Sequence, residues 1–169
     1  MRPLRLFVAL ALIGHPVQAQ QIPTPESVLG FPVGTDFELA TYEQSLEYFQ
    51  RLAAASDQVE LQEVGLTSYG RPWYLALISS AENLQDAERY REIAHRLAYP
   101  AEDMTEAEAR RLAMDGKVIV HIDGGLHATE VAHAQHTIQL AYDLVTGDSN
   151  PEIAAILDSV ILVLWFSIN

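Results

Sequence analysis

The chain has 169 residues, of which 49% are hydrophobic and 20% are charged, and its formal net charge is −13 from 10 basic and 23 acidic side chains. The few basic residues are scattered among acidic ones, so there is no basic stripe to neutralise phosphates, and we do not expect nucleic acid as a partner. The chain contains no cysteine. Packing or a metal, rather than disulfide bonds, must therefore stabilise the fold.

The first nineteen residues have the pattern of a signal peptide. Arg2 and Arg5 precede an uncharged run from Leu6 to Ile13, and Val17-Gln18-Ala19 resembles a cleavage site with small residues. A buried helix is the alternative interpretation, because the run is shorter than the roughly 20 residues that cross a bilayer. We predict a signal peptide over residues 1–19, a secreted or periplasmic protein, and no membrane attachment after processing.

A Pro-containing lead over residues 20–40 precedes a predicted helix and hairpin. Thr41 and Gln44 form a capping box, which predicts a helix that runs to about residue 55. Apolar residues from Val59 to Leu66 predict a strand with a bulge near Glu63. Turn residues then lead into a second strand over residues 73–79, and two charge-rich surface helices are expected over residues 83–98 and 105–116.

The last part of the chain predicts a β-α-β unit. A strand over Lys117 to Asp123 is followed by a helix over Glu130 to Val145. A short helix that begins at Asn150 then leads into a second strand over Val160 to Ile168. Such crossovers join parallel strands, so both strands end at one rim of the sheet, where open α/β sheets bind ligands. Because the final strand is apolar from 160 to 166, we expect a central strand, with its outer edge uncovered in this chain and with the domain continuing beyond Asn169.

The loop between the first of these strands and its helix holds the candidate site, in the sequence HIDGGLHATE from His121 to Glu130. Gly124 and Gly125 let the backbone turn and approach a ligand, and residues three apart in a first helical turn project from one side. His127 and Glu130 could therefore hold one ion. Imidazole and carboxylate both suit Zn²⁺, although a catalytic zinc takes three protein ligands and a water. The spacing also places Glu130 on the apolar face of the helix, where a lone charge is costly and a cation would compensate it.

The stretch from Asp123 to Glu130 resembles the first zinc-binding motif, D-x-G-x-H-x-x-E, of metallocarboxypeptidases of the carboxypeptidase A type. Residues 155–169 resemble the family's approach to its Asn-Pro-Asp-Gly turn, and residues 42–79 resemble its opening helix and hairpin. The resemblance implies an α/β/α sandwich around a mixed, mostly parallel central sheet, with residues 41–169 as the N-terminal part of the catalytic domain. It also implies Zn²⁺ as the cofactor, with His127 and Glu130 as two of its ligands.

The activity that the resemblance implies is hydrolysis of C-terminal amide bonds in peptides or proteins. In the family, zinc polarises the scissile carbonyl and lowers the pKa of its water, a glutamate acts as general base, and an arginine binds the terminal carboxylate of the substrate. That glutamate, that arginine and the third zinc ligand are expected beyond Asn169. No catalytic residue is therefore assigned, and we expect the 169-residue chain alone to be inactive. Some relatives carry arginine where this chain has Thr129, which leaves the substrate preference open.

Two other functions remain open at this point. A related amide hydrolase, which removes acyl groups from small acyl-amino acids, shares the H-x-x-E motif and the fold, although a signal peptide argues against it. A non-catalytic binding protein that keeps the fold but has lost part of the metal site is the other alternative. The sequence leaves the oligomeric state open.

The remaining histidines are interpreted as structural or solvated. His133 lies three residues after Glu130 and would complete a local triad, but it points toward the edge of the apolar face, and the resemblance places the third ligand downstream. His136 lies on the polar side of the helix and is expected to be solvated. His121 is expected to be a buried histidine of the strand. Asp123 would tie down the glycine loop or, alternatively, orient a ligand histidine.

Overall fold

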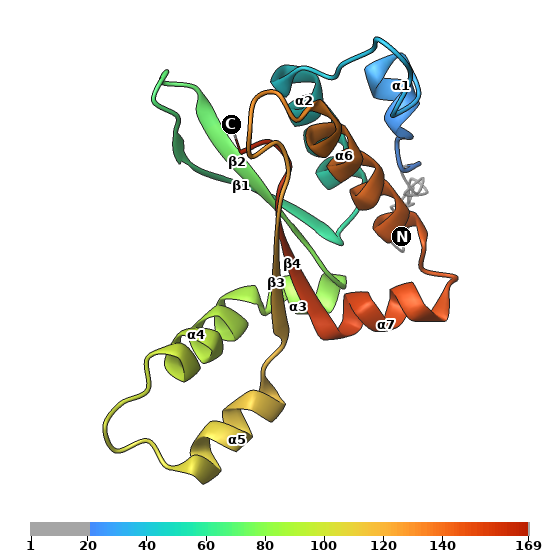
Figure 1. Ribbon diagram of the computed structural model, residues 1–169. Coiled ribbons are helices and arrows are strands. Elements are labelled where there is room, and N and C mark those ends of the chain that lie inside the picture. Colours follow the sequence, from blue (N-terminus) through green and yellow to red (C-terminus); the bar gives the residue numbers. More distant parts are fainter. Residues whose placement is uncertain (1–20, 169) are drawn as a thin grey trace, which may run out of the picture.

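The computed structural model describes residues 21–168, so the predicted signal peptide over residues 1–19 and the final residue lie outside the described part of the chain. The helices are α1 (Pro25–Leu29), α2 (Tyr42–Ala55), α3 (Ala81–Gln85), α4 (Ala87–Ala98), α5 (Glu106–Asp115), α6 (Val131–Thr146) and α7 (Pro151–Ser159). The strands are β1 (Val59–Leu66), β2 (Pro72–Ile78), β3 (Val118–Asp123) and β4 (Val160–Trp165), as Figure 1 shows. Within residues 21–168, no helix is long and apolar enough to cross a membrane.

The strands form one mixed sheet in the order β1-β2-β4-β3. β1 pairs with β2 and β2 pairs with β4 in antiparallel fashion, whereas β3 and β4 are parallel. The predicted α/β fold with a mixed sheet is confirmed, but the expected parallel majority is not seen among the described strands. The physical reason is the hairpin, in which a tight turn reverses the chain, whereas parallel strands need a long crossover, here the α6–α7 segment. The predicted bulge is also present, since the register shifts between Glu63 and Gly65.

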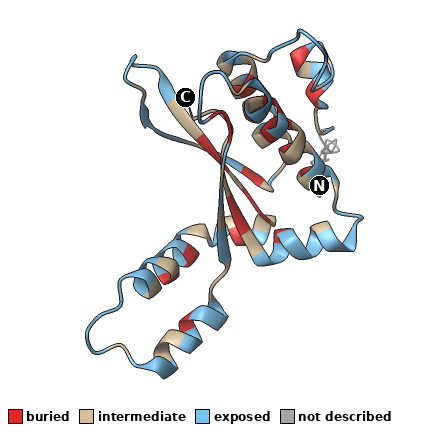
Figure 2. Ribbon diagram, viewed as in Figure 1, coloured by how far each residue is buried: buried red, intermediate tan, exposed pale blue. Residues whose placement is uncertain are grey.

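Strand β4 occupies the centre of the sheet, as its apolar sequence predicted, and its side chains alternate between the two faces. On one face, Leu164 and the following Phe166 are fully buried with α2 and α6, and Phe166 stacks on Phe49 with ring centroids 4.4 Å apart. On the other face, Ile161 packs with apolar residues of α4 and with Leu112 of α5. Helices therefore lie on both faces, although Figure 2 shows that α4 and α5 are mostly exposed.

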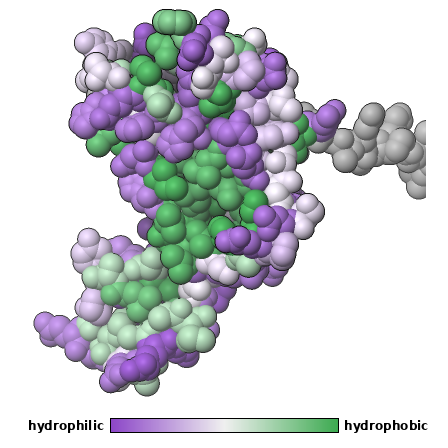
Figure 3. Space-filling view, turned by 45° about the vertical axis from the view of Figure 1, so that its right-hand side comes forward, coloured by the Kyte–Doolittle hydropathy of each residue, from purple (hydrophilic) through white to green (hydrophobic). Residues whose placement is uncertain are grey.

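Among the described strands, β1 and β3 are the edges of the sheet, and β4 is not an edge. The expectation that β4 would have an uncovered edge was wrong, because β2 and β3 flank it on its two sides. In β3, by contrast, Val118 is 61% exposed and Ile119 is 41% exposed. Figure 3 shows a hydrophobic area in the middle of the molecule, between the α1, α2 and α6 group and the α4–α5 pair. An exposed apolar edge strand of this kind favours self-association.

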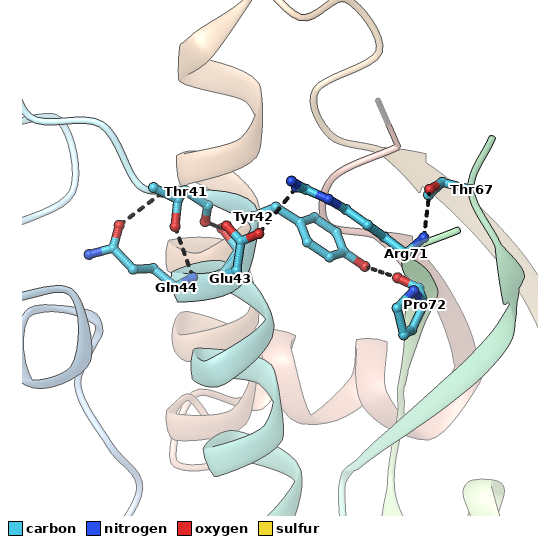
Figure 4. Close-up of polar contacts among 8 residues, drawn as sticks. Thr41, Tyr42, Glu43, Gln44, Thr67, Arg71 and Pro72 are labelled. Carbon is cyan, nitrogen blue, oxygen red and sulfur yellow. Dashed lines mark hydrogen bonds and ion pairs between the residues drawn. The ribbon is translucent and has the colours of Figure 1, made fainter. Parts of the chain in front are cut away.

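Polar contacts fix the hairpin against the start of α2. The predicted capping box is present, since Thr41 Oγ1 accepts from Gln44 N at 3.2 Å and Gln44 Oε1 accepts from Thr41 N at 2.9 Å. The Tyr42 hydroxyl donates to the Pro72 carbonyl at 2.9 Å, and Arg71 pairs with a glutamate of α2 at 3.1 Å. Figure 4 shows these side chains bridging α2 and β2.

The lead segment packs on the helix that follows the candidate site. Gln135 of α6 is buried, and its side chain accepts from Gly34 N at 3.3 Å and donates to the Glu38 carbonyl at 2.9 Å. These two bonds join residues about 100 positions apart in the chain. They hold the N-terminal half of α6 against a segment that the sequence alone does not connect with it.

Candidate metal centre

The glycine loop after β3 is held between β4 and α6. Gly124 N donates to the Trp165 carbonyl at 2.7 Å, and Ile168 N donates to the Gly124 carbonyl at 2.9 Å. A Cβ atom at Gly124 would lie 2.5 Å from Thr137 Cγ2 and 3.0 Å from the carbonyl oxygens of His133 and Phe166. The loop backbone was expected to approach a ligand closely, but at Gly124 it approaches α6 and the segment after β4. Only glycine fits this position, and the packing sets where the next residues of the loop lie.

His127 and Glu130 meet in the turn that precedes α6. Glu130 N donates to the His127 carbonyl at 2.9 Å, and His127 Nδ1 lies 2.7 Å from Glu130 Oε2. The two side chains are 66% and 41% exposed. The hydrogen bond from the imidazole holds the pKa of the Glu130 carboxyl below its ordinary value. The structure thus brings the two residues predicted as metal ligands together at one solvent-accessible place.

Glu130 does not lie on the buried face of the helix, so that prediction was wrong. The helix begins at Val131, and Glu130 precedes it as the N-cap residue with non-helical backbone angles, φ −94° and ψ 63°. A rotation of about 100° per residue cannot be extended back to a residue that is outside the helix. The buried residues of α6 begin only at Gln135, and the apolar ones are Ile138, Ala141 and Val145. The Glu130 carboxylate pairs with His127 and is not buried, so burial gives no reason for a compensating cation at this position.

The structure places His133 beside Glu130 and leaves His136 on the solvent side. His133 Nδ1 lies 3.4 Å from Glu130 Oε2, and its side chain is 50% exposed. His136 Nδ1 instead lies 2.7 Å from the His133 carbonyl, and the residue is exposed, in agreement with its predicted solvated position. His133 was expected at the edge of the apolar face, although its spacing of three residues from Glu130 was the signal that could have predicted this contact.

His121 and Asp123 form a pair on the open face of β3. His121 Nε2 lies 2.8 Å from Asp123 Oδ1, and the histidine side chain is 56% exposed, so the prediction of a buried histidine was wrong. Asp123 contacts that histidine, which is neither of the two roles that the sequence suggested for it. Both differences have one cause: β3 is an edge strand, and its face beside Trp165 is not covered by the described residues.

The donor atoms at His127 and Glu130 fit zinc in type but supply only part of a site. Zinc bonds of about 2.0–2.2 Å in a tetrahedral arrangement hold two ligand atoms about 3.3–3.5 Å apart. The observed 2.7 Å between His127 Nδ1 and Glu130 Oε2 must therefore open by more than half an ångström, roughly, which exposed side chains can accommodate. Within residues 21–168, no group of three or more His, Asp or Glu side chains could hold a metal ion.

A cavity of about 810 Å³ opens beside the β1–β2 hairpin. It is lined by the hairpin, the start of α2 and the residues after β4, including Tyr42, Arg71, Trp73, Ser167 and Ile168. The Ile168 backbone bond to Gly124 connects this cavity to the base of the loop. His127 and Glu130 do not line it, so the cavity and the ligand pair are separate features of one rim.

Comparison with known proteins places the chain in one family. The model of the family described as zinc carboxypeptidase matches residues 45–169. Among solved structures, carboxypeptidase A from Helicoverpa armigera is similar with a TM-score of 0.54 and 17% identity, covering 86% of this chain and 30% of that one. Thrombin activatable fibrinolysis inhibitor is similar with a TM-score of 0.55 and 11% identity, covering 85% of this chain and 29% of that one. No curated protein matches the chain.

The structural matches establish the fold alone, because their sequence identities of 17% and 11% are too low to support a function. This chain spans about 30% of the length of the Helicoverpa armigera enzyme. The family match covers most of the chain and includes the glycine loop, His127 and Glu130.

Proposed function

The chain belongs to the zinc carboxypeptidase family, and we propose that it supplies two zinc ligands, His127 and Glu130, to a hydrolase that cleaves C-terminal amide bonds of peptides or proteins. The observation that supports the proposal is the contact between His127 Nδ1 and Glu130 Oε2 at 2.7 Å. One nitrogen and one oxygen ligand atom, both on exposed side chains, would be two of the three protein ligands that a His₂Glu zinc site needs.

The residues of the chain have defined tasks in this proposal. His127 and Glu130 hold the ion, and the packed loop at Gly124 keeps them at the carboxyl end of β3. When bound, zinc supplies Lewis acidity toward a substrate carbonyl and makes water a better nucleophile at neutral pH. Because the two side chains are exposed, a substrate can reach them without a movement of the described backbone.

The rest of the catalytic machinery is proposed to come from the part of the relatives' length that this chain does not span. That part would supply the third protein ligand, a general base and a group for the terminal carboxylate of the substrate. We also propose that residues 1–19 direct export to the periplasm or the cell exterior, that residues 20–40 form a lead, and that residues 41–169 begin the catalytic domain. Thr129 leaves the preference for particular C-terminal residues open.

Substitution of the ligands in the whole protein tests the proposal. His127→Ala and Glu130→Ala should each abolish zinc retention after dialysis and peptide hydrolysis, while the circular dichroism spectrum stays that of the unmodified protein. His136→Ala is the matched control, because His136 is exposed on the same helix but contacts neither ligand, and it should change neither quantity. Full zinc retention and full turnover in either ligand variant would show that the assignment is wrong.

A further inference from the structure

The Glu130 carboxylate is placed at the start of α6 without being fixed by the helix backbone. As the N-cap residue it makes no side-chain capping hydrogen bond. Its Oε2 atom instead lies at hydrogen-bond distance, 2.7 Å, from His127 Nδ1 and at ion-pair distance, 3.4 Å, from His133 Nδ1. The direction of this carboxylate therefore depends on imidazole neighbours.

We propose that His133 is a positioning residue that holds the Glu130 carboxylate in the orientation in which it binds the metal. The inference rests on the proposed function, in which His127 and Glu130 are both ligands. One lone pair on His127 Nδ1 cannot serve a metal while the same nitrogen donates a proton to Glu130. A metal bound by both residues would also need the two ligand atoms further apart than the 2.7 Å between them. Without the contact from His127, His133 would be the imidazole neighbour that remains beside the carboxylate.

The backbone of α6 keeps His133 in place independently of the loop. His133 N donates to the Glu130 carbonyl at 3.2 Å, and the following turn is buried through Gln135 and Thr137. Thr137 also donates to the Phe166 carbonyl at 3.2 Å, which joins this turn to the end of β4. His133 thus projects from a packed helix, whereas His127 projects from a turn. Groups that orient a metal ligand without binding the metal typically contribute about 10- to 100-fold to metal affinity.

Two other roles for His133 agree less well with the structure. A third-ligand role is not supported, because within residues 21–168 no group of three or more His, Asp or Glu side chains is arranged so that it could hold a metal ion. A purely stabilising surface pair is the other alternative, and exposed ion pairs contribute little to folding stability. Metal affinity, rather than stability, is therefore the quantity that separates a positioning role from a stabilising one.

The test titrates the full 169-residue chain and its variants with zinc sulfate by isothermal titration calorimetry, at low protein concentration. His133→Ala should weaken zinc binding by about 10- to 100-fold. The visible absorption spectrum of the Co²⁺-substituted chain should change with it, while the thermal midpoint of the metal-free chain should not. His133→Gln should recover part of the affinity, because the amide can still donate to the carboxylate. His136→Ala is the control, since His136 contacts the ring and the backbone carbonyl of His133 but pairs with neither His127 nor Glu130 in any hydrogen bond or ion pair of the described residues.

The outcomes separate this inference from the proposed function. If His127→Ala loses zinc but His133→Ala binds zinc as well as the unmodified chain, the positioning role is wrong and the ligand assignment stands. An equal loss in His136→Ala would also overturn the inference, because it would show a general effect of removing a histidine. If neither His127→Ala nor Glu130→Ala changes the affinity, the proposed function fails, and the role of His133 fails with it.

Discussion

Substitution of Gly124 by alanine tests whether the glycine loop is fixed by packing against the protein. The added Cβ would lie 2.5 Å from Thr137 Cγ2 and 3.0 Å from the carbonyl oxygens of His133 and Phe166. Two of these three atoms are backbone atoms of α6 and of the segment after β4, so no side-chain rotation can remove the clash. The loop must move away from both elements, and His127 moves with it.

The expected cost follows from the contacts that this movement breaks. Overpacking in a close-packed site typically costs about 1–3 kcal/mol. The two backbone bonds at Gly124, 2.7 Å to the Trp165 carbonyl and 2.9 Å from Ile168 N, are weakened as well. With each bond contributing about 0.5–1.5 kcal/mol, we expect Gly124→Ala to lower the free energy of unfolding by about 2–6 kcal/mol. That is a large share of the roughly 5–15 kcal/mol that stabilises an ordinary domain.

Equilibrium denaturation in urea, at low protein concentration, measures this loss. Tryptophan fluorescence is a suitable signal, because the Trp73 and Trp165 rings lie 4.4 Å apart across β2 and β4. Gly125→Ala is the matched control: its φ of 65° disfavours alanine by about 1–2 kcal/mol, but the nearest atom to its Cβ lies 3.6 Å away. A Gly124→Ala variant that is no less stable than Gly125→Ala would refute the packing argument.

Three further predictions follow from other parts of the structure. Thr41→Ala removes the cap of α2 and should lower the free energy of unfolding by about 1 kcal/mol in urea denaturation; an unchanged midpoint would contradict the capping role. The pKa of Glu130 is lowered, so its contact with His127 should be present above the unfolded pKa and be lost as the pH falls through the folded one; an NMR titration showing an ordinary or raised glutamate pKa would contradict this. The 169-residue chain should self-associate through β3 and show no chelator-sensitive peptide hydrolysis, and Ile119→Lys should reduce its mass in light scattering; a monomeric, active chain would disprove both statements.

The sequence by itself determined the features that depend on near neighbours in the chain. The capping box at Thr41 joins residues three positions apart, and the bulge near Glu63 follows from a phase change within one strand. The contact between His127 and Glu130 is equally local, because the two residues lie three positions apart in one hydrogen-bonded turn. The central position of β4 was predictable as well, since a strand without polar residues must be covered on both faces.

Only the tertiary structure decided which side chains are covered, because burial depends on segments that are distant in the sequence. His121 was expected in the core, but the sheet order makes β3 an edge strand and leaves it exposed. The sequence suggested that glycine is needed at position 124 for its backbone freedom. In the structure, glycine is needed there because Thr137 and the Phe166 carbonyl leave no room for a Cβ atom. The antiparallel majority of the sheet also arises from a distant pairing, between β2 and β4, whose strands lie more than 80 residues apart in the chain. Periodicity and spacing carry no information about such pairings, because many strand orders satisfy the same local pattern.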